Sequence, residues 1–192
     1  IRDRAMANMI REAGGMQSDT AAEIKSSHLY GIEFDREIYA LACANMLIHK
    51  DGKTNLEQMD ARTESACEWM KSKPITKVLM NPPYENKYGC MTIVENVLDN
   101  VPAHTQCAFI LPDKKLEKAS KAQIKRILKN HRLRKVIKLP EDLFFGIGIT
   151  TSIFVFEAGV GQDGKEFFAC YMESDGLATV KNKGRHDIYG KW

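Results

Sequence analysis

The sequence predicts an α/β fold built on one mostly parallel sheet, with an antiparallel hairpin toward its C-terminal end. Short apolar runs alternate with segments of helical periodicity, which is the order expected of strands joined by covering helices. Of the 192 residues, 44% are apolar and 28% charged, which suits a single globular domain with a substantial core. The last apolar runs follow one another without a helix between them, and this favours the hairpin.

In the first half of the chain, periodicity indicates the helices and short apolar runs indicate the strands. Residues 5–13 place apolar side chains on one helical face, and Gly14-Gly15 ends that helix. The run 28–33 is predicted as a strand. The helix predicted next, over residues 35–49, has Asp35 as its N-cap. One stripe of this helix comprises Ile38, Leu41, Ala42, Asn45 and Ile48. Residues 54–59 are a weak strand, residues 65–71 irregular or a short helix, and residues 77–80 a clearer strand.

In the second half, prolines mark the ends of two predicted strands. Pro112 closes a buried strand over residues 106–111, and Pro140 closes another over residues 134–139. Residues 151–157 and 167–172 complete the predicted sheet. Helices are predicted over residues 92–101 and 117–131, the second with Ile124, Ile127 and Leu128 facing inward. We expect one catalytic domain over residues 1–175, followed by a polar extension over residues 176–192.

Composition argues against several classes of protein. No run of about 18 apolar residues is present, so we expect no membrane-spanning helix and no membrane partner. The five cysteines form no C-x-x-C pair, and the histidines show no ligand spacing with them. We therefore predict reduced thiols, a cytoplasmic protein and no metal site.

Positive charge is concentrated in one part of the chain. Residues 114–138 contain eleven Lys and Arg residues and a single Glu, although the whole chain has a net charge of only +3. Such a run is typical of a surface that contacts nucleic acid, but it is equally typical of a solvated helix face.

The sequence Asn81-Pro82-Pro83-Tyr84 directly follows the predicted strand 77–80. Both prolines lack a backbone N–H, and each restricts the residue before it to extended conformations. The loop is therefore stiff and presents carbonyl acceptors with few donors. It suits neither an oxyanion hole nor a phosphate site, because both of these need N–H donors.

A planar group that carries an NH₂ fits this loop. The amine would donate one hydrogen bond to the Asn81 side chain and one to the Pro82 carbonyl, while the ring stacks on Tyr84. Both acceptors make the amine nitrogen more electron-rich, and alignment with an electrophilic methyl group lowers the barrier further. The alternative is a plain turn that terminates a strand, since Asn-Pro and Pro-Pro are common loop dipeptides.

Three segments in this order resemble the N-6 adenine-specific DNA methylases, most closely the modification subunits of type I restriction-modification systems and related single-chain enzymes. They are L-Y-G-I-E-F-D-R-E-I-Y-A-L-A-C-A-N-M, then N-P-P-Y, then L-P-E-D-L-F-F-G-I-G-I-T-T-S-I-F-V-F. The resemblance covers residues 29–157. It implies a Rossmann-like sheet and methyl transfer from S-adenosylmethionine to N6 of an adenine flipped out of double-stranded DNA. It also implies specificity and restriction subunits or domains as partners.

The resemblance assigns roles to residues at three strand ends. Asn81, Pro82, Pro83 and Tyr84 are expected to be catalytic, with Asn81 also close to the cofactor. Glu33 is expected to accept hydrogen bonds from the cofactor ribose, which matches the general role of an acid at this strand end. Asp60 is expected to accept from the cofactor adenine amine, and the neighbours Phe34 and Ala61 to contact the cofactor. A helix-entry acid is the alternative for Glu33, and a plain helix cap is the alternative for Asp60.

Substrate-binding roles fall on Tyr84 and on one of Phe144 and Phe145, because an aromatic residue near this point packs on the flipped base in the family. The alternative is that both phenylalanines belong to the core. Gly146 and Gly148 are interpreted as a source of flexibility before the hairpin and not as a dinucleotide loop.

One feature of the family is missing from this sequence. The Gly-rich loop of the pattern D-P-x-x-G-x-G, which follows the first strand, has no counterpart here. We therefore expect the chain to lack the first strand and this loop, and to bind S-adenosylmethionine weakly or not at all by itself. Two further alternatives stay open: a methyltransferase of RNA guanine or protein glutamine amines, and a non-catalytic DNA-binding or assembly fragment.

Overall fold

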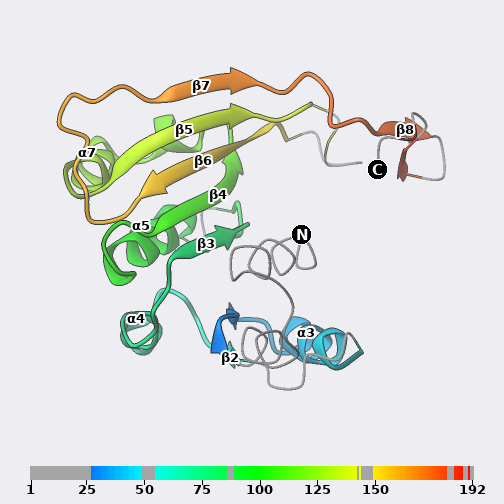
Figure 1. Ribbon diagram of the computed structural model, residues 1–192, viewed down its shortest axis with the longest axis horizontal. Coiled ribbons are helices and arrows are strands. Elements are labelled where there is room, and N and C mark those ends of the chain that lie inside the picture. The colour runs from blue at the N-terminus through cyan, green and yellow to red at the C-terminus, as the bar shows by residue number, and fades with distance from the viewer. Residues whose placement is uncertain are drawn as a thin grey trace, which may run out of the picture. The chain divides into compact units, whose positions relative to one another are not determined.

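The computed structural model describes residues 27–48, 55–85, 89–141, 143, 149–180, 184–187 and 190 (Figure 1). The chain divides into two compact units, Ile1–Ala66 and Cys67–Trp192. The helix predicted over residues 5–13 lies outside the described residues. Among the helices in the described ranges, none is long and apolar enough to cross a membrane.

The first unit contains a parallel strand pair and one helix. β1 (Tyr30–Glu33) pairs with β2 (Asn55–Gln58), and α3 (Arg36–Ile48) lies between them in sequence. The Asp35 carboxylate accepts the backbone N–H groups of Glu37 and Ile38, both at 2.9 Å. The predicted N-cap and both predicted strands are thereby confirmed.

The half-buried face of α3 differs from the predicted stripe. Ile38, Leu41 and Ile48 are exposed, and no residue of α3 is fully buried. Ala42 of the predicted stripe is half-buried, and the other half-buried side chains are those of Tyr39, Cys43 and Met46. These recur at the spacing of one helical face, and the Tyr39 hydroxyl reaches the Leu56 carbonyl of β2 at 3.4 Å. The side of α3 that faces β2 is therefore rotated from the predicted one.

The second unit is built on a five-stranded sheet with the order β3-β4-β6-β5-β7. Its strands are β3 (Lys77–Met80), β4 (Gln106–Pro112), β5 (Arg132–Lys138), β6 (Thr151–Glu157) and β7 (Phe168–Tyr171). All five coincide with predicted strands to within two residues at each end. The α/β class predicted from the sequence is therefore confirmed.

Strand directions in this sheet are more mixed than predicted. β3 and β4 are parallel, as are β5 and β7, whereas β6 is antiparallel to both β4 and β5. The expected C-terminal hairpin is the β5–β6 pair, but β6 lies inside the sheet and not at its edge (Figure 1). The sheet is thus mixed, because one antiparallel strand separates two parallel pairs.

Four helices flank these strands in sequence. They are α4 (Glu64–Lys71), α5 (Cys90–Asn100), α6 (Lys115–Lys118) and α7 (Lys121–Asn130). The single helix predicted over residues 117–131 is wrong, because two helices occupy this region. Ser120 separates them: its backbone is extended and its hydroxyl accepts the Gln123 N–H at 3.1 Å, which makes it the N-cap of α7.

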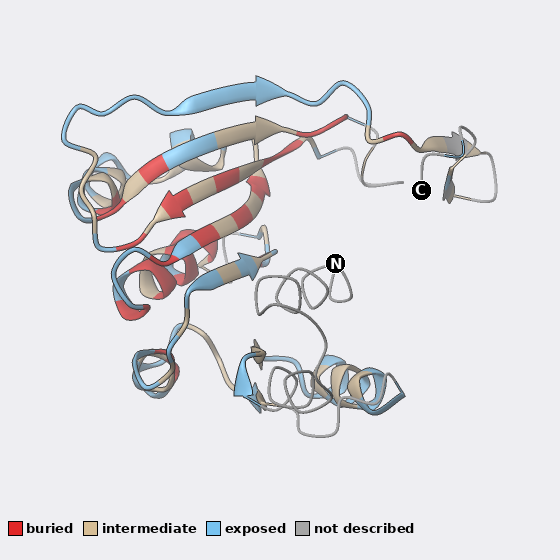
Figure 2. Ribbon diagram, viewed as in Figure 1, coloured by how far each residue is buried: buried red, intermediate tan, exposed pale blue. Residues whose placement is uncertain are grey.

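The core lies in the second unit, along the middle strands and α5 (Figure 2). In β4 every second side chain is buried, namely Cys107, Phe109 and Leu111. The Phe109 ring meets the Phe156 ring of β6 edge to face, with 6.2 Å between centroids. β7 is exposed along its whole length, as Figure 2 shows.

Two short strands follow β7, although residues 167–172 were expected to be the last strand. β8 (Ala178–Val180) and β9 (Gly184–His186) form a separate antiparallel pair. They fall within the predicted polar extension over residues 176–192. The expected division of the chain at residue 175 stays a prediction.

Candidate functional site

The loop of residues 81–84 begins where β3 ends. Asn81 and Pro83 are exposed, Pro82 is buried and Tyr84 is half-buried. The Tyr84 hydroxyl donates to Asn81 Oδ1 at 2.7 Å. Asn81 is therefore presented at the surface with its amide oxygen directed to the phenol of Tyr84.

Burial raises the pKa of the Tyr84 phenol, with a smaller contribution from Cys90. The hydroxyl consequently keeps its proton at neutral pH and acts as the donor toward Asn81. An amide oxygen has two lone pairs, so one acceptor position remains on Asn81 for an incoming amine. The binding of a substrate amine by Asn81 and the Pro82 carbonyl stays a prediction.

The backbone of the same loop is held from a second direction. Lys115 Nζ, at the start of α6, donates to the Tyr84 carbonyl oxygen at 2.6 Å. Nothing in the sequence distinguishes Lys115 from the other basic residues of the run 114–138, so sequence reasoning missed it. Only the three-dimensional structure identifies Lys115. The loop of residues 81–84 follows β3 and Lys115 follows β4, and these two strands are neighbours in the sheet.

A small cavity adjoins the first turn of α5. Its volume is about 210 Å³, and its lining residues are Gly89, Cys90, Met91, Thr92, Lys115, Ala119 and Gln123. This is below the roughly 300–1,000 Å³ of typical small-molecule pockets. The cavity can therefore admit part of a ligand but not enclose a whole cofactor.

Glu33 lies at the carboxyl end of β1 in the first unit and is half-buried. Its Oε1 accepts the backbone N–H of Asp35 at 2.8 Å, which fixes the carboxylate at the strand end. Phe34 follows it and is 60% exposed. An exposed aromatic ring beside a fixed acid suits a bound nucleoside, and it is also what a simple helix entry would show.

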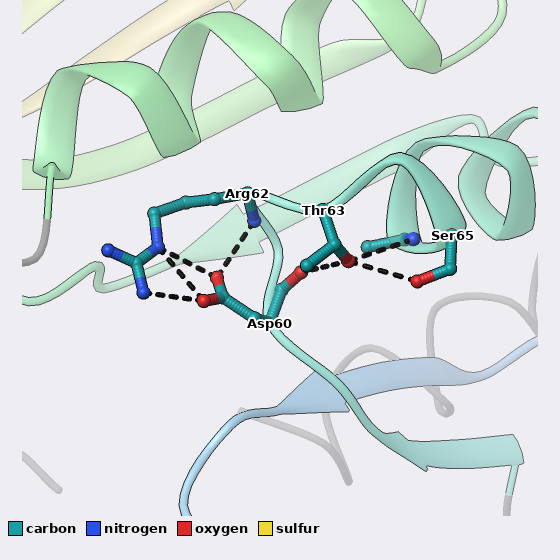
Figure 3. Close-up of polar contacts among 5 residues, drawn as sticks. Asp60, Arg62, Thr63 and Ser65 are labelled. Carbon is teal, nitrogen blue, oxygen red and sulfur yellow. Dashed lines mark hydrogen bonds and ion pairs between the residues drawn. The ribbon is translucent and has the colours of Figure 1, made fainter.

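Asp60 follows β2 and is engaged by Arg62 (Figure 3). Its Oδ1 accepts the backbone N–H and Nε of Arg62, both at 2.9 Å, and Oδ2 pairs with Nη2. The hydrogen bond from the Arg62 side chain holds the pKa of Asp60 below its ordinary value. Asp60 is therefore ionised at neutral pH and available only as an acceptor.

The helix cap in this region is not Asp60. Thr63 Oγ1 accepts the Ala66 N–H at 3.3 Å and donates to the Asp60 carbonyl at 2.7 Å, so Thr63 caps α4 (Figure 3). Ala61, between these two residues, is half-buried. Arg62 Nε also lies 3.0 Å from Oδ2, so the four Arg62 contacts take up about as many lone-pair positions as a carboxylate offers.

The basic run is partly neutralised by acidic partners. Arg126 pairs with Glu95 at 2.9 Å, Arg134 with Glu157 at 2.8 Å, and Lys138 lies 3.8 Å from Asp113. Lys121, Lys125 and Lys129 are exposed on α7. Both sequence interpretations of the run therefore retain support, the solvated face through these ion pairs and the DNA contact through the exposed lysines.

The expected site residues fall into two groups. Glu33, Phe34, Asp60 and Ala61 belong to the first unit, and residues 81–84 to the second. Phe144 and Phe145 lie outside the described residues, as do Gly146 and Gly148. The convergence of the two groups on one ligand stays a prediction.

Known proteins similar to this chain were found by sequence and by structure. Residues 4–110 and 94–183 match the family described as N-6 DNA Methylase. The chain is 31% identical over 191 residues to the type II restriction enzyme and methyltransferase RM.BcgI of Heyndrickxia coagulans. The aligned segment covers 94% of this chain and 30% of that protein.

The fold is similar to that of two solved modification proteins. The EcoKI M protein, from a type I restriction enzyme, superposes with a TM-score of 0.65 at 18% identity, over 80% of this chain and 35% of its own. A modification subunit of a putative type I restriction enzyme from Vibrio vulnificus YJ016 superposes with a TM-score of 0.61 at 18% identity. The match covers 78% of this chain and 36% of that subunit. The chain thus spans about a third of the length of the proteins it matches.

Proposed function

The chain belongs to the N-6 DNA methylase family, and we propose that it carries the amine-binding loop of a site-specific DNA adenine-N6 methyltransferase. The family consists of S-adenosylmethionine-dependent enzymes related to the methyltransferases of restriction-modification systems. The proposed substrate is an adenine flipped out of double-stranded DNA. The observation that carries the proposal is the Tyr84 hydroxyl bond to Asn81 Oδ1 on a loop with two prolines.

The loop residues have separate tasks in this proposal. Asn81 Oδ1 and the Pro82 carbonyl accept the two hydrogens of the adenine amine and so direct its lone pair. The Tyr84 ring stacks on the flipped base, an interaction worth about 1–3 kcal/mol per base, which offsets part of the cost of flipping. One of Phe144 and Phe145 would also stack on the flipped base.

The cofactor site is proposed on the first unit. Glu33, fixed at the end of β1, would accept from the ribose hydroxyls, and Asp60 would accept from the adenine amine in place of one of its Arg62 contacts. Phe34 and Ala61 would line the adenine, and Asn81 would lie beside the methyl group. When bound, S-adenosylmethionine supplies the electrophilic methyl of its sulfonium. The Glu33 and Asp60 carboxylates fit this cofactor because both are acceptors and the cofactor offers hydroxyl and amine donors.

Open strand edges in each unit support one further part of the proposal. Within the described residues, β1 pairs with β2 alone and β3 with β4 alone. We propose that the first strand of the family's sheet, which the sequence analysis expects this chain to lack, pairs at such an open edge and is followed by the Gly-rich cofactor loop. The expected weak binding of S-adenosylmethionine by the 192-residue segment stays a prediction, and calorimetry on that segment would measure it.

The partners proposed for the whole protein are DNA-recognition and restriction functions, on separate subunits or on the same polypeptide. RM.BcgI is described as both a restriction enzyme and a methyltransferase, and the EcoKI M protein as part of a type I restriction enzyme, which supports this part. Methylation of RNA guanine or protein glutamine presents a similar amine to the loop. Labelled methyl transfer from the full-length protein to duplex DNA, RNA and protein would separate these substrates.

Replacing Asn81 by Ala in the full-length protein tests the proposal most directly. We expect methyl transfer to duplex DNA to fall at least about 100-fold, as on removal of one key transition-state hydrogen bond. Thermal unfolding and DNA affinity should be unchanged, because Asn81 is exposed. Asn130→Ala, at another exposed asparagine on α7, is the control and should retain activity.

Equal activity of Asn81→Ala and the control would contradict the proposal. It would instead favour the non-catalytic alternative, a DNA-binding or assembly module. If the full-length protein transfers methyl groups to RNA or protein but not to DNA, the proposed DNA substrate is wrong. The proposed binding of an amine by the loop would still stand.

A further inference from the structure

Lys115, which follows β4 in the chain, contacts the loop of residues 81–84 through its side chain. Its ammonium donates to the Tyr84 carbonyl oxygen at 2.6 Å, and its side chain is half-buried, unlike that of its exposed neighbour Lys114. We infer that Lys115 is a positioning residue for methyl transfer, acting through Tyr84 on Asn81. The inference rests on the proposed function of this loop and assigns a task to a residue outside it.

The sheet places Lys115 beside the loop. β3 and β4 are parallel, with Met80 opposite Phe109, so the loop begins at the level of Ile110. β4 continues to Pro112, and α6 begins at Lys115. The last residues of β4 therefore extend past the end of β3, and a long side chain from the following turn reaches the loop.

The turn that carries Lys115 is itself fixed to the next strand. The Asp113 N–H donates to the Thr150 carbonyl at 3.1 Å, and the Ser152 hydroxyl donates to Asp113 Oδ1 at 2.7 Å. Lys138 of β5 adds an ammonium 3.8 Å from Asp113 Oδ2. The turn that precedes Lys115 is thus held by contacts of Asp113 with β6 and β5, and this limits the movement of the Lys115 backbone.

The two prolines limit the hydrogen bonds that can hold the loop. Pro82 and Pro83 lack N–H groups, so they cannot donate hydrogen bonds to neighbouring strands. A charged donor to a carbonyl forms a shorter and stronger bond than a neutral one, and here it holds the backbone of Tyr84. Since the Tyr84 hydroxyl bonds Asn81 Oδ1, fixing this backbone also fixes the acceptor that faces the substrate amine.

Three variants of the full-length protein test the inference: Lys115→Met, Lys115→Arg and the control Lys114→Met. Methionine retains the apolar stem and removes the donor, whereas arginine retains a donor. Because a misplacement of about 1 Å can reduce a rate up to about 100-fold, we expect kcat of Lys115→Met to fall about 10-fold. KM for duplex DNA and the melting temperature should stay close to wild type.

Lys115→Arg should recover at least half of the lost rate, and Lys114→Met should match wild type. Hydrogen–deuterium exchange supplies a readout that is independent of activity. The amides of Tyr84 and Glu85 should exchange several-fold faster in Lys115→Met than in Lys114→Met, because the loop backbone has lost its support.

Four results would overturn the inference: an unchanged kcat in Lys115→Met, equal losses in both methionine variants, no recovery with arginine, or unfolding of Lys115→Met. The last would make Lys115 a residue of the fold. If wild type methylates another amine and not DNA, the proposed substrate fails, but the three variants can still be compared on that amine. If wild type methylates nothing, the proposed function fails, and the exchange rates alone decide whether Lys115 supports the loop.

Discussion

At the residue scale, Asn81 and Tyr84 form a hydrogen-bonded pair, because the Tyr84 phenol donates to the Asn81 amide oxygen at 2.7 Å. The raised pKa of Tyr84 keeps the hydroxyl protonated, so it can act as the donor toward Asn81 Oδ1. The bond leaves one lone pair of Asn81 Oδ1 for the substrate amine. The hydroxyl of Tyr84 therefore orients the acceptor, while its ring is left for stacking.

Tyr84→Phe separates these two tasks. The ring is retained, so we expect DNA affinity to stay within about twofold of wild type. Loss of the hydroxyl bond costs about 1 kcal/mol in orientation of Asn81, which corresponds to roughly a fivefold fall in kcat. Steady-state methylation of duplex DNA by the full-length protein measures both quantities.

Tyr84→Ala is the companion variant and should weaken DNA binding as well, because it removes the stacking ring. A rise in kcat for Tyr84→Phe would contradict the orienting role. It would mean that the hydroxyl competes with the substrate for Asn81.

At the scale of elements, two sets of polar contacts join α5 to α7 and the residue that follows it. Glu95 of α5 accepts from Arg126 Nε at 2.9 Å and from Gln123 Nε2 at 2.9 Å, both on α7. Buried His131, the C-cap of α7, bonds Asp99 of α5 at 2.9 Å. These contacts fix α7 relative to α5, whose first turn lines the cavity shared with Lys115.

The Glu95 contacts should make stability depend on pH. Burial raises the pKa of Glu95, but the bonds from Arg126 and Gln123 outweigh burial and hold the pKa below its ordinary value. Their contribution is therefore fully present above about pH 4.5 and is lost as the pH falls through the lowered pKa. Because Arg126 is 60% exposed, solvent screens the ion pair and we expect its contribution to stability to be small.

Denaturant unfolding of Glu95→Gln and wild type, followed between about pH 7 and pH 3, measures this contribution. The difference in the free energy of unfolding should be largest at neutral pH and should shrink in acid. Glu117→Gln, at an exposed carboxyl on α6, is the control and should show almost no difference. A difference for Glu95→Gln that grows as the pH falls would contradict the assignment.

At the scale of the whole molecule, the two units differ in how much they bury. In the second unit Cys107, Phe109, Leu111 and Phe156 are fully buried in the sheet. In the first unit no residue of α3 is buried. Regions with few buried apolar contacts open locally at lower free energy, so the first unit should open more readily.

Thiol labelling of the native chain tests this difference. Burial raises the pKa of Cys107 to about 12, so both access and ionisation protect it. We expect exposed Cys170 to react fastest, half-buried Cys43 of α3 more slowly, and Cys107 only when the five-stranded sheet unfolds. Mass spectrometry of digests after timed alkylation gives the three rates. Labelling of Cys107 as fast as that of Cys43 would show that the core of the second unit is not stable by itself.

Much of the fold could be predicted from local pattern. Apolar runs gave the strands β1 to β7, and Asp35 gave the start of α3, because side-chain period and capping act over a few residues. The split between α6 and α7 was missed, since Ser120 is an ordinary polar residue until its hydroxyl is seen to cap a helix. The face of α3 was also misplaced, because which stripe is covered depends on β2 and not on α3 alone.

The sequence by itself determined the α/β class, the family and the donor-poor loop after β3, since two prolines remove the same N–H groups in any context. Only the tertiary structure decided that β6 lies antiparallel inside the sheet, that Tyr84 bonds Asn81, that Arg62 engages Asp60, and that Lys115 supports the loop. Strand order and these contacts depend on which segments become neighbours in space. Local residue pattern does not encode that, because pairing between distant segments is set by the packing of the whole sheet.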